Sequence, residues 1–153
     1  MNRLNFMTAA AVVLIAAGCG NDGKPVIPKD AELEKRVEKT LSRMSLDEKI
    51  GQMTQITIDA ASEKSADGNS YTLNEDKLAY FIDTYKVGSF LNTPVGKAIP
   101  AAEWNVLVKT LNDRSLKVMG IPTLYGLDHI HGTTYISDGT LFPQPIAVAA
   151  TFN

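Results

Sequence analysis

The chain has 153 residues, and 15 lysines and arginines face 17 aspartates and glutamates, so the formal net charge at pH 7 is −2. No basic stripe is present that could neutralise nucleic-acid phosphates, so a nucleic-acid partner is not expected. Hydrophobic residues make up 44% of the sequence and Cys19 is the single cysteine, which indicates a globular protein without an internal disulfide framework.

The N-terminal residues predict export and a lipid anchor. Arg3 precedes an uninterrupted apolar run over residues 9–17, which is shorter than the roughly 20 residues that a membrane-spanning helix needs. This pattern is typical of a signal peptide over residues 1–18, and the small residues before Cys19 resemble a bacterial lipobox. The alternative is an ordinary signal peptide with a chance cysteine.

We therefore expect an exported protein that is lipid-anchored through Cys19 in the cell envelope, at the periplasmic face or on the outer-membrane surface. Gly, Asn, Asp, Lys and two prolines dominate the following segment, and residues 19–30 are predicted to be a flexible tether.

Two helices are predicted next. Apolar residues recur at helical spacing from Ala31 to Met44 and charged residues lie between them, as in an amphipathic helix. Ser45 and Glu48 have the spacing of a capping box, which predicts the start of a second, short helix. Three apolar side chains of this helix are expected to be buried: Leu46, Ile50 and Met53.

Strands and helices then alternate. Strands are predicted at residues 54–58, 87–91 and 121–125, and residues 60–70 are expected to form a long loop. The helices between the strands begin at Asn74 and span about residues 101–118. Their expected buried residues are Leu78, Phe81, Ile82 and Tyr85 in one and Trp104, Leu107, Val108 and Leu111 in the other.

This order predicts an α/β protein with a parallel sheet, either a barrel or an open sheet. Functional groups of both architectures gather at the carboxyl ends of the strands. Asp59 ends the first strand and could face such a site, although no motif supports it. Glu103, Asp113 and Arg114 are expected on the solvated face of the long helix.

The segment Gly126-Leu127-Asp128-His129-Ile130-His131-Gly132 follows the third strand. The carboxylate of Asp128 could accept hydrogen bonds from two neighbouring hydroxyls of a polyol, and it could equally be a helix cap or stabilise a loop. His131 could simply anchor the loop. Asp128, His129 and His131 could also ligate zinc in a metal-dependent hydrolase, but no further ligand cluster is visible.

The sequence resembles the family-3 glycoside hydrolases from Arg36 to Asn153, in family order and spacing. The resemblance rests on residues 36–53, the strand at 87–91, Gly120-Ile121-Pro122, the segment at 126–132, Thr140-Leu141-Phe142-Pro143-Gln144 and Ala149-Ala150-Thr151-Phe152-Asn153. One departure is Pro145, where relatives usually have a small residue or glycine, and it could change the local loop.

The resemblance implies that residues 31–153 are the N-terminal portion of a (β/α)8 TIM-type barrel, which is therefore incomplete here. It implies a β-glucosidase-like enzyme that acts on oligosaccharides or β-glucosides by a retaining mechanism, without a cofactor or metal. Asp128 aligns with the family's aspartate that binds sugar hydroxyls. The aspartate nucleophile and the glutamate acid/base are expected beyond Asn153, so no catalytic residue is assigned.

A complete barrel needs about 250 residues. This piece alone is therefore expected to be inactive and unstable, because half a sheet leaves unpaired strand edges and an uncovered apolar face. A non-catalytic sugar-binding lipoprotein, attached to the membrane only through its lipid, is the alternative from another functional class.

Overall fold

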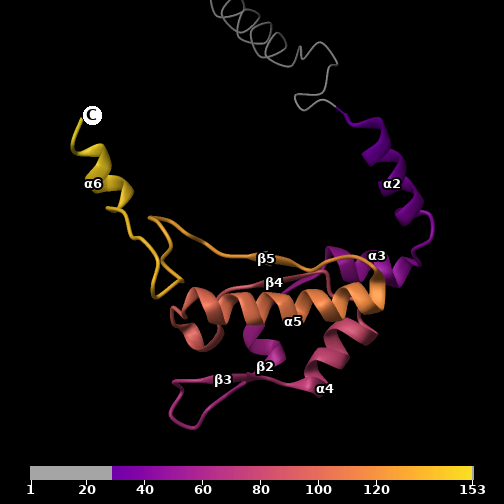
Figure 1. Ribbon diagram of the computed structural model, residues 1–153, viewed down its shortest axis with the longest axis horizontal. Helices are drawn as coiled ribbons and strands as arrows, with labels where there is room; N and C mark the ends of the chain where they lie inside the picture. Colours follow the sequence, from indigo (N-terminus) through magenta and orange to yellow (C-terminus); the bar gives the residue numbers. More distant parts are fainter. Residues whose placement is uncertain (1–28, 153) are drawn as a thin grey trace, which may run out of the picture. The chain divides into compact units, whose positions relative to one another are not determined.

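The computed structural model describes residues 29–152 (Figure 1). The predicted signal peptide, Cys19 and the tether up to residue 28 lie outside the described residues. The chain divides into two compact units, residues 1–43 and 44–153. Within residues 29–152, the structure contains no helix that combines the length and the apolar character needed to cross a membrane.

The described part of the first unit is helix α2, Ala31–Leu41, which confirms the first predicted helix. The carboxylate of Asp30 caps it by accepting hydrogen bonds from the Glu32 and Leu33 amides at 2.9 and 3.1 Å. Because a side-chain oxygen satisfies amides that have no partner inside the helix, the helix begins directly after Asp30. No residue of α2 is buried.

Helix α3, Leu46–Met53, begins with the predicted capping box. The Glu48 amide donates to the Ser45 hydroxyl at 3.2 Å, and the Ser45 amide donates to the Glu48 carboxylate at 2.8 Å. The hydrogen bond from the Ser45 amide and then that of the Ser45 hydroxyl lower the pKa of Glu48. Both ends of the motif are therefore formed as the sequence predicts.

The face that α3 buries was predicted wrongly. Leu46, Ile50 and Met53 are exposed, whereas Gly51 is buried. A Cβ atom on Gly51 would lie 2.2 Å from the carbonyl oxygen of Tyr85, so only glycine allows the helix backbone to come this close. The Gly88 amide donates to the Gly51 carbonyl at 2.9 Å and joins the two backbones directly.

A three-stranded parallel sheet forms the centre of the second unit, in the order β1-β4-β5. Its strands are β1 Gln55–Thr57, β4 Ser89–Leu91 and β5 Leu124–Gly126. β1 and β4 lie within the predicted segments, β5 begins near the end of its predicted segment and extends one residue beyond it, and each strand is shorter than predicted. Ile56, Phe90 and Tyr125 stand in one row across the sheet. The α/β class with a parallel sheet is confirmed.

Residues 60–70 do not form one long loop. The 3-10 turn η1, Ile58–Ala61, leads into an antiparallel hairpin of β2, Ser62–Lys64, and β3, Tyr71–Leu73. Asp67 organises the hairpin turn by accepting hydrogen bonds from Ser65 and Asn69, which lower its pKa to about 2. The strands contain three residues each, too few to give a clear alternation in the sequence.

Two helices cover one face of the sheet. Helix α4, Glu75–Leu78, begins at the Asn74 cap and continues as the π-helix η2, Ala79–Thr84. Helix α5, Ala101–Met119, ends at Gly120 in the left-handed conformation. Both lie on the same side of β4 and β5 (Figure 1). The buried core between sheet and helices consists of Ile58, Ala61, Leu78, Ile82, Val87, Phe90, Ile99, Trp104, Leu107 and Leu111.

The two faces of the sheet differ in burial. Phe90 is fully buried, and Ile56 and Tyr125 of the same row pack against the core. On the opposite face Gln55 and Thr57 of β1 are exposed, and Leu124 of β5 is 71% exposed. Parallel sheets are usually covered on both faces. Within residues 44–152, this sheet has helices on one face only.

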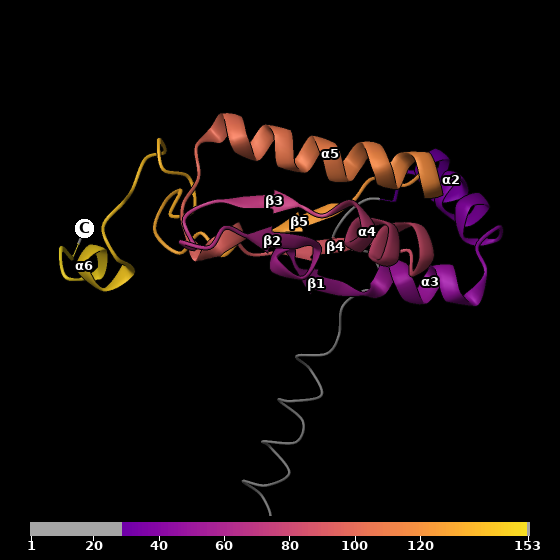
Figure 2. The same cartoon turned by 90° about the horizontal axis from the view of Figure 1, so that it is seen from below.

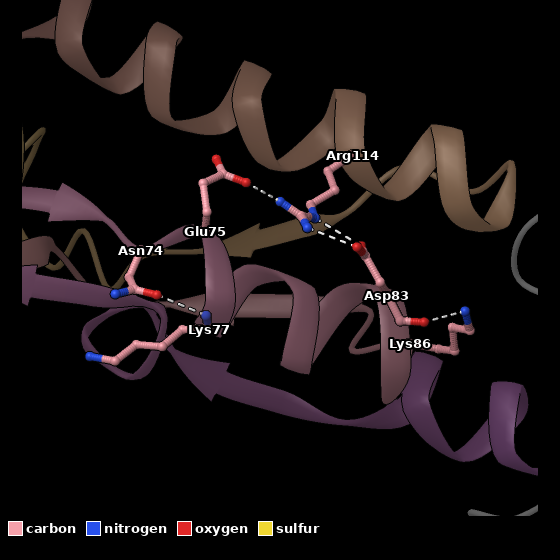
Figure 3. A network of polar contacts seen from close by, with 6 residues as sticks. All are labelled: Asn74, Glu75, Lys77, Asp83, Lys86 and Arg114. Carbon is pink, nitrogen blue, oxygen red and sulfur yellow. Dashed lines mark hydrogen bonds and ion pairs between the residues drawn. The ribbon is translucent and has the colours of Figure 1, made fainter.

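Arg114 was predicted to lie on the solvated face of the long helix, and this prediction was wrong. Its side chain joins α5 to the α4–η2 helix (Figure 3). Its Nε and Nη2 donate to the two carboxylate oxygens of Asp83 at 2.8 and 2.7 Å. Its Nη1 donates to Glu75 at 2.6 Å. The hydrogen bonds from Arg114 lower the pKa of Asp83 and keep it ionised. The side chain of Arg114 is 21% exposed.

A short helix, α6, Pro145–Ala149, was not predicted from the sequence. Pro145 is its first residue, a position where the missing amide hydrogen costs no helical hydrogen bond and the fixed φ favours the helix. Pro145, where the sequence departs from the pattern of family-3 glycoside hydrolases, is therefore the start of a helix. None of the α6 residues is buried.

Candidate functional site at the carboxyl edge of the sheet

Three connections leave the sheet at the carboxyl ends of its parallel strands: residues 58–73 after β1, residues 92–100 after β4, and residues 127–142 after β5, here called the β5 loop. Because the strands are parallel, these ends lie at one edge, and helix α5 begins there. In Figure 2 the orange and yellow segment that follows β5 lies beside the N-terminal end of α5.

The first two connections are joined through Asp59. Its carboxylate accepts a hydrogen bond from the Val95 amide at 3.3 Å and pairs with the ammonium group of Lys64 at 3.4 Å. Lys97 contacts the side-chain oxygen of Asn69 in the hairpin. Asp59 is at the predicted edge, but both of its oxygens already have partners. Asp59 therefore holds the β4 connection at Val95, whose φ of 55° is unusual for a β-branched residue.

Tyr125 joins β5 to the β4 connection. Its hydroxyl donates to the Asn92 carbonyl at 2.7 Å, and the Asn92 amide donates to the Gly126 carbonyl at 3.3 Å. Burial first, and then the electrostatic effect of Tyr71 and of the Asp59 carboxylate, raise the pKa of Tyr125 above its ordinary value. The phenol therefore stays protonated at neutral pH and remains a donor.

Tyr71 of the hairpin behaves in the same way. Burial raises its pKa to about 12, with a further contribution from the charge and hydrogen bond of Glu103 at the start of α5. This contact ties the β1 connection to the first turn of α5. Glu103 is exposed, as predicted, but it is also a hydrogen-bond partner.

Asp128 lies two residues beyond the end of β5 and is exposed. Within the part of the chain that the structure describes, no hydrogen bond or ion pair involves its carboxylate, so both oxygens can accept hydrogen bonds from a ligand. The structure places Asp128 at the predicted edge. Its role in sugar binding stays a prediction.

His131 anchors the β5 loop, one of the roles considered for it from the sequence. Its Nδ1 lies 2.9 Å from the Phe142 carbonyl oxygen, and because a carbonyl only accepts, Nδ1 carries the proton. The Phe142 amide donates back to the His131 carbonyl at 2.9 Å. Gly132 has a φ of 92°, and a Cβ there would lie 2.5 Å from the Thr140 carbonyl oxygen.

The histidines do not gather with other ligands. Among residues 29–152 there is no group of three or more His, Cys, Asp or Glu side chains that could hold a metal ion. The ring of His129 packs against that of Tyr135, with 5.5 Å between ring centroids. The proposed His-x-His zinc pair therefore has no third protein ligand in the described part of the chain.

A hollow of about 720 Å³ lies at the other end of the strands, between α3 and η2. Its lining includes Ile50, Tyr80, Phe81 and Tyr85, together with Thr54 and Val87, which precede β1 and β4. Asp128 does not contribute to it. Sequence reasoning did not predict this hollow, because Ile50 and Tyr85 were assigned to the core.

Parallel strands alternate with helices, and at the carboxyl edge stands a carboxylate that has no partner among residues 29–152, which defines an α/β protein whose ligand site is expected at that edge. The family model described as the glycosyl hydrolase family 3 N terminal domain matches residues 45–153. A curated relative, the "Lysosomal beta glucosidase" of Dictyostelium discoideum, is 39% identical in an alignment of 128 residues that covers 76% of this chain.

The chain belongs to glycosyl hydrolase family 3, in the N-terminal domain of that family. The matched segment spans 15% of the length of the Dictyostelium relative. Family membership confirms the resemblance that residues 36–153 carry.

Proposed function

We propose that the complete enzyme hydrolyses terminal β-linked glucosyl or related residues of oligosaccharides, and that the residues described here contribute sugar binding through Asp128. The family match over residues 45–153 carries this proposal, together with the name of the 39% identical relative. The carboxylate of Asp128 beyond β5, which has no partner in the described part of the chain, supports it, because an ionised carboxylate can accept from two hydroxyls of one sugar ring.

The same residues are proposed to form the first part of a (β/α)8 barrel. The strand order follows the chain without reversal, and α4 and α5 cover one face of the sheet. An open doubly wound sheet has helices on both faces and a reversal of strand order, whereas a barrel has all helices outside and side chains of the strands inside. The exposed Gln55, Thr57 and Leu124 occupy the face that would line such an interior.

The proposed mechanism retains the configuration of the anomeric carbon. It requires an aspartate nucleophile and a glutamate acid/base about 5–5.5 Å apart. We assign both to residues outside this sequence, as the family resemblance implies; the matched segment covers 15% of the relative. Asp128 then binds hydroxyls of the sugar and takes no part in bond cleavage.

A lipid anchor at Cys19 in the cell envelope remains part of the proposal, supported by the signal-peptide pattern before it. An exported enzyme held by its N terminus would act on saccharides outside the cytoplasm.

The test is to express the complete reading frame that contains these residues and to measure nitrophenol release from p-nitrophenyl β-D-glucoside. The wild-type protein should hydrolyse it with β-configured glucose as the first product by NMR. Asp128→Asn should lower kcat/KM by about 30-fold or more, since a lost charged hydrogen bond costs about 2–3 kcal/mol. The control Asp113→Asn changes an exposed carboxylate of α5 and should stay within about twofold.

Two results would contradict the proposal. Saturable binding of glucosides without hydrolysis would identify a sugar-binding lipoprotein instead. Hydrolysis by the 153-residue chain alone, which we expect to be inactive, would place the catalytic carboxylates within it.

A further inference from the structure

The β5 loop is attached to the first turn of α5 by two side chains, those of Asp138, to which the sequence analysis gave no role, and of Trp104, which it expected only to be buried. Asp138 lies in the loop, and its carboxylate accepts a hydrogen bond from the Ala101 amide at 2.8 Å. Trp104 lies in α5, and its indole Nε1 donates to the Tyr135 carbonyl at 2.8 Å. One contact starts from the loop and the other from the helix, so the two elements hold each other.

The Asp138 contact completes a helix end that lacks its own cap. Pro100 occupies the N-cap position of α5 and has no side-chain oxygen to accept an amide. Asp138 supplies that acceptor from a position 37 residues further along the chain. Its negative charge also faces the positive end of the helix dipole, which favours the contact.

Backbone pairing extends the attachment. The Ile99 amide donates to the Tyr135 carbonyl at 3.3 Å, and the Ser137 amide donates to the Ile99 carbonyl at 3.0 Å. Ile99 is 6% exposed and belongs to the buried core, so this pairing joins the loop to the core. Trp104 is likewise 6% exposed, and its ring packs edge-on against the ring of Tyr125 in β5, with 5.3 Å between the ring centroids.

The attachment reaches the residue next to Asp128. The ring of Tyr135 packs against that of His129 at 5.5 Å, and Tyr135 is the residue whose carbonyl Trp104 holds. Asp128 itself has no hydrogen-bond partner among the described residues, so its position depends on the loop on both sides of it. On one side is β5, and on the other is the contact with α5.

We propose that Asp138 and Trp104 are positioning residues, which hold the β5 loop on α5 so that Asp128 faces the sugar. This inference rests on the proposed function of Asp128. It assigns to neither residue any contact with the substrate. Preorganising a binding group avoids an ordering cost on association, so loss of the attachment should weaken sugar binding.

The test uses the complete enzyme. Asp138→Ala removes the acceptor, and Asp138→Asn restores an acceptor oxygen at the same place. Trp104→Phe keeps an aromatic ring but loses the indole donor. Asp113→Ala is the matched control, because it removes an exposed carboxylate of α5 that pairs with Lys109.

Asp138→Ala and Trp104→Phe should raise KM for the nitrophenyl glucoside about fivefold or more while kcat stays within about twofold, the pattern of lost uniform binding. Asp138→Asn and the control should change KM by less than about twofold. When Asp128 is already replaced by asparagine, Asp138→Ala should raise KM by less than about twofold further, because both substitutions act through the Asp128 carboxylate.

An equal rise in KM in both backgrounds, or no rise at all, would overturn the assignment. Hydrogen exchange of amides 127–138 gives a readout independent of activity. Asp138→Ala should speed it about fivefold and Asp138→Asn should not. If the wild-type enzyme acts on no β-glucoside, the proposed function fails, and exchange alone then decides whether Asp138 holds the loop.

Discussion

Replacing Arg114 tests whether one guanidinium holds α5 to the α4–η2 helix. It makes two hydrogen bonds to Asp83 and one to Glu75. Hydrogen bonds to charged groups contribute about 1.5–3 kcal/mol each, but the carboxylates are 40% and 78% exposed, so water replaces much of this. We expect Arg114→Ala to cost about 2 kcal/mol and Arg114→Lys about 1 kcal/mol, because lysine keeps the charge but loses the bidentate geometry.

The assay is hydrogen exchange of the amides of residues 79–86 in the complete protein. Since about 1.4 kcal/mol corresponds to a tenfold change, Arg114→Ala should speed exchange about 30-fold and Arg114→Lys about fivefold. Lys109→Ala is the control, because its ion pair with Asp113 is exposed on both sides and is worth about 0.3–0.5 kcal/mol. If the amides of Arg114→Ala exchanged no faster than those of this control, the Arg114 hydrogen bonds would not contribute measurably to stability.

The pH dependence follows from Asp83, whose pKa Arg114 lowers in the folded protein. A carboxylate with a depressed folded pKa contributes stability that is fully present above its unfolded value of about 3.9 and is lost as the pH falls through the folded value. The difference in exchange between wild type and Arg114→Ala, corrected for intrinsic rates, should therefore be constant near pH 6 and shrink below about pH 4. A difference that grows on acidification would contradict this sign.

Three further changes have defined outcomes. Gly51→Ala should destabilise the protein by about 2 kcal/mol in urea unfolding, because its Cβ would meet the Tyr85 carbonyl oxygen, whereas Gly68→Ala, with nothing within 4 Å of its Cβ, should cost about 1 kcal/mol through its left-handed backbone. Ser45→Ala should cost about 1 kcal/mol in the same assay by removing the α3 cap. Cys19→Ser should move the protein from the detergent phase to the aqueous phase in Triton X-114 partitioning, and equal partitioning of the two proteins would contradict the lipid anchor.

The long-range features of the fold were not all visible in the sequence. The stripe of Trp104, Leu107 and Leu111 repeats over a 19-residue helix, so its buried face could be predicted. Helix α3 is only 8 residues long, and its buried face is decided by backbone contact between Gly51 and residues 85–88. No local pattern reports a contact of that kind, and apolar periodicity pointed to the opposite face.

The candidate site divides in the same way. Asp128 could be found because it follows a strand and lies in a family motif. Asp138 could not, since its partner Ala101 contributes only a backbone amide, which has the same chemistry at every residue except proline. The prediction for Arg114 was wrong for a related reason. Its charge indicated a solvent-exposed position, and the sequence did not show that its partner, Asp83, lies 31 residues away along the chain.

The anchoring of the loops at the carboxyl edge follows one physical rule. Tyr125, Trp104 and His131 donate side-chain hydrogen bonds to the carbonyls of Asn92, Tyr135 and Phe142, respectively. A carbonyl acceptor does not depend on the side chain of its residue, so these loops can vary in sequence and remain in place. The donors cannot vary so freely, because a phenylalanine in their place removes the side-chain hydrogen bond to the carbonyl. Substitutions at the three donors should therefore disturb the edge more than substitutions at the three acceptors.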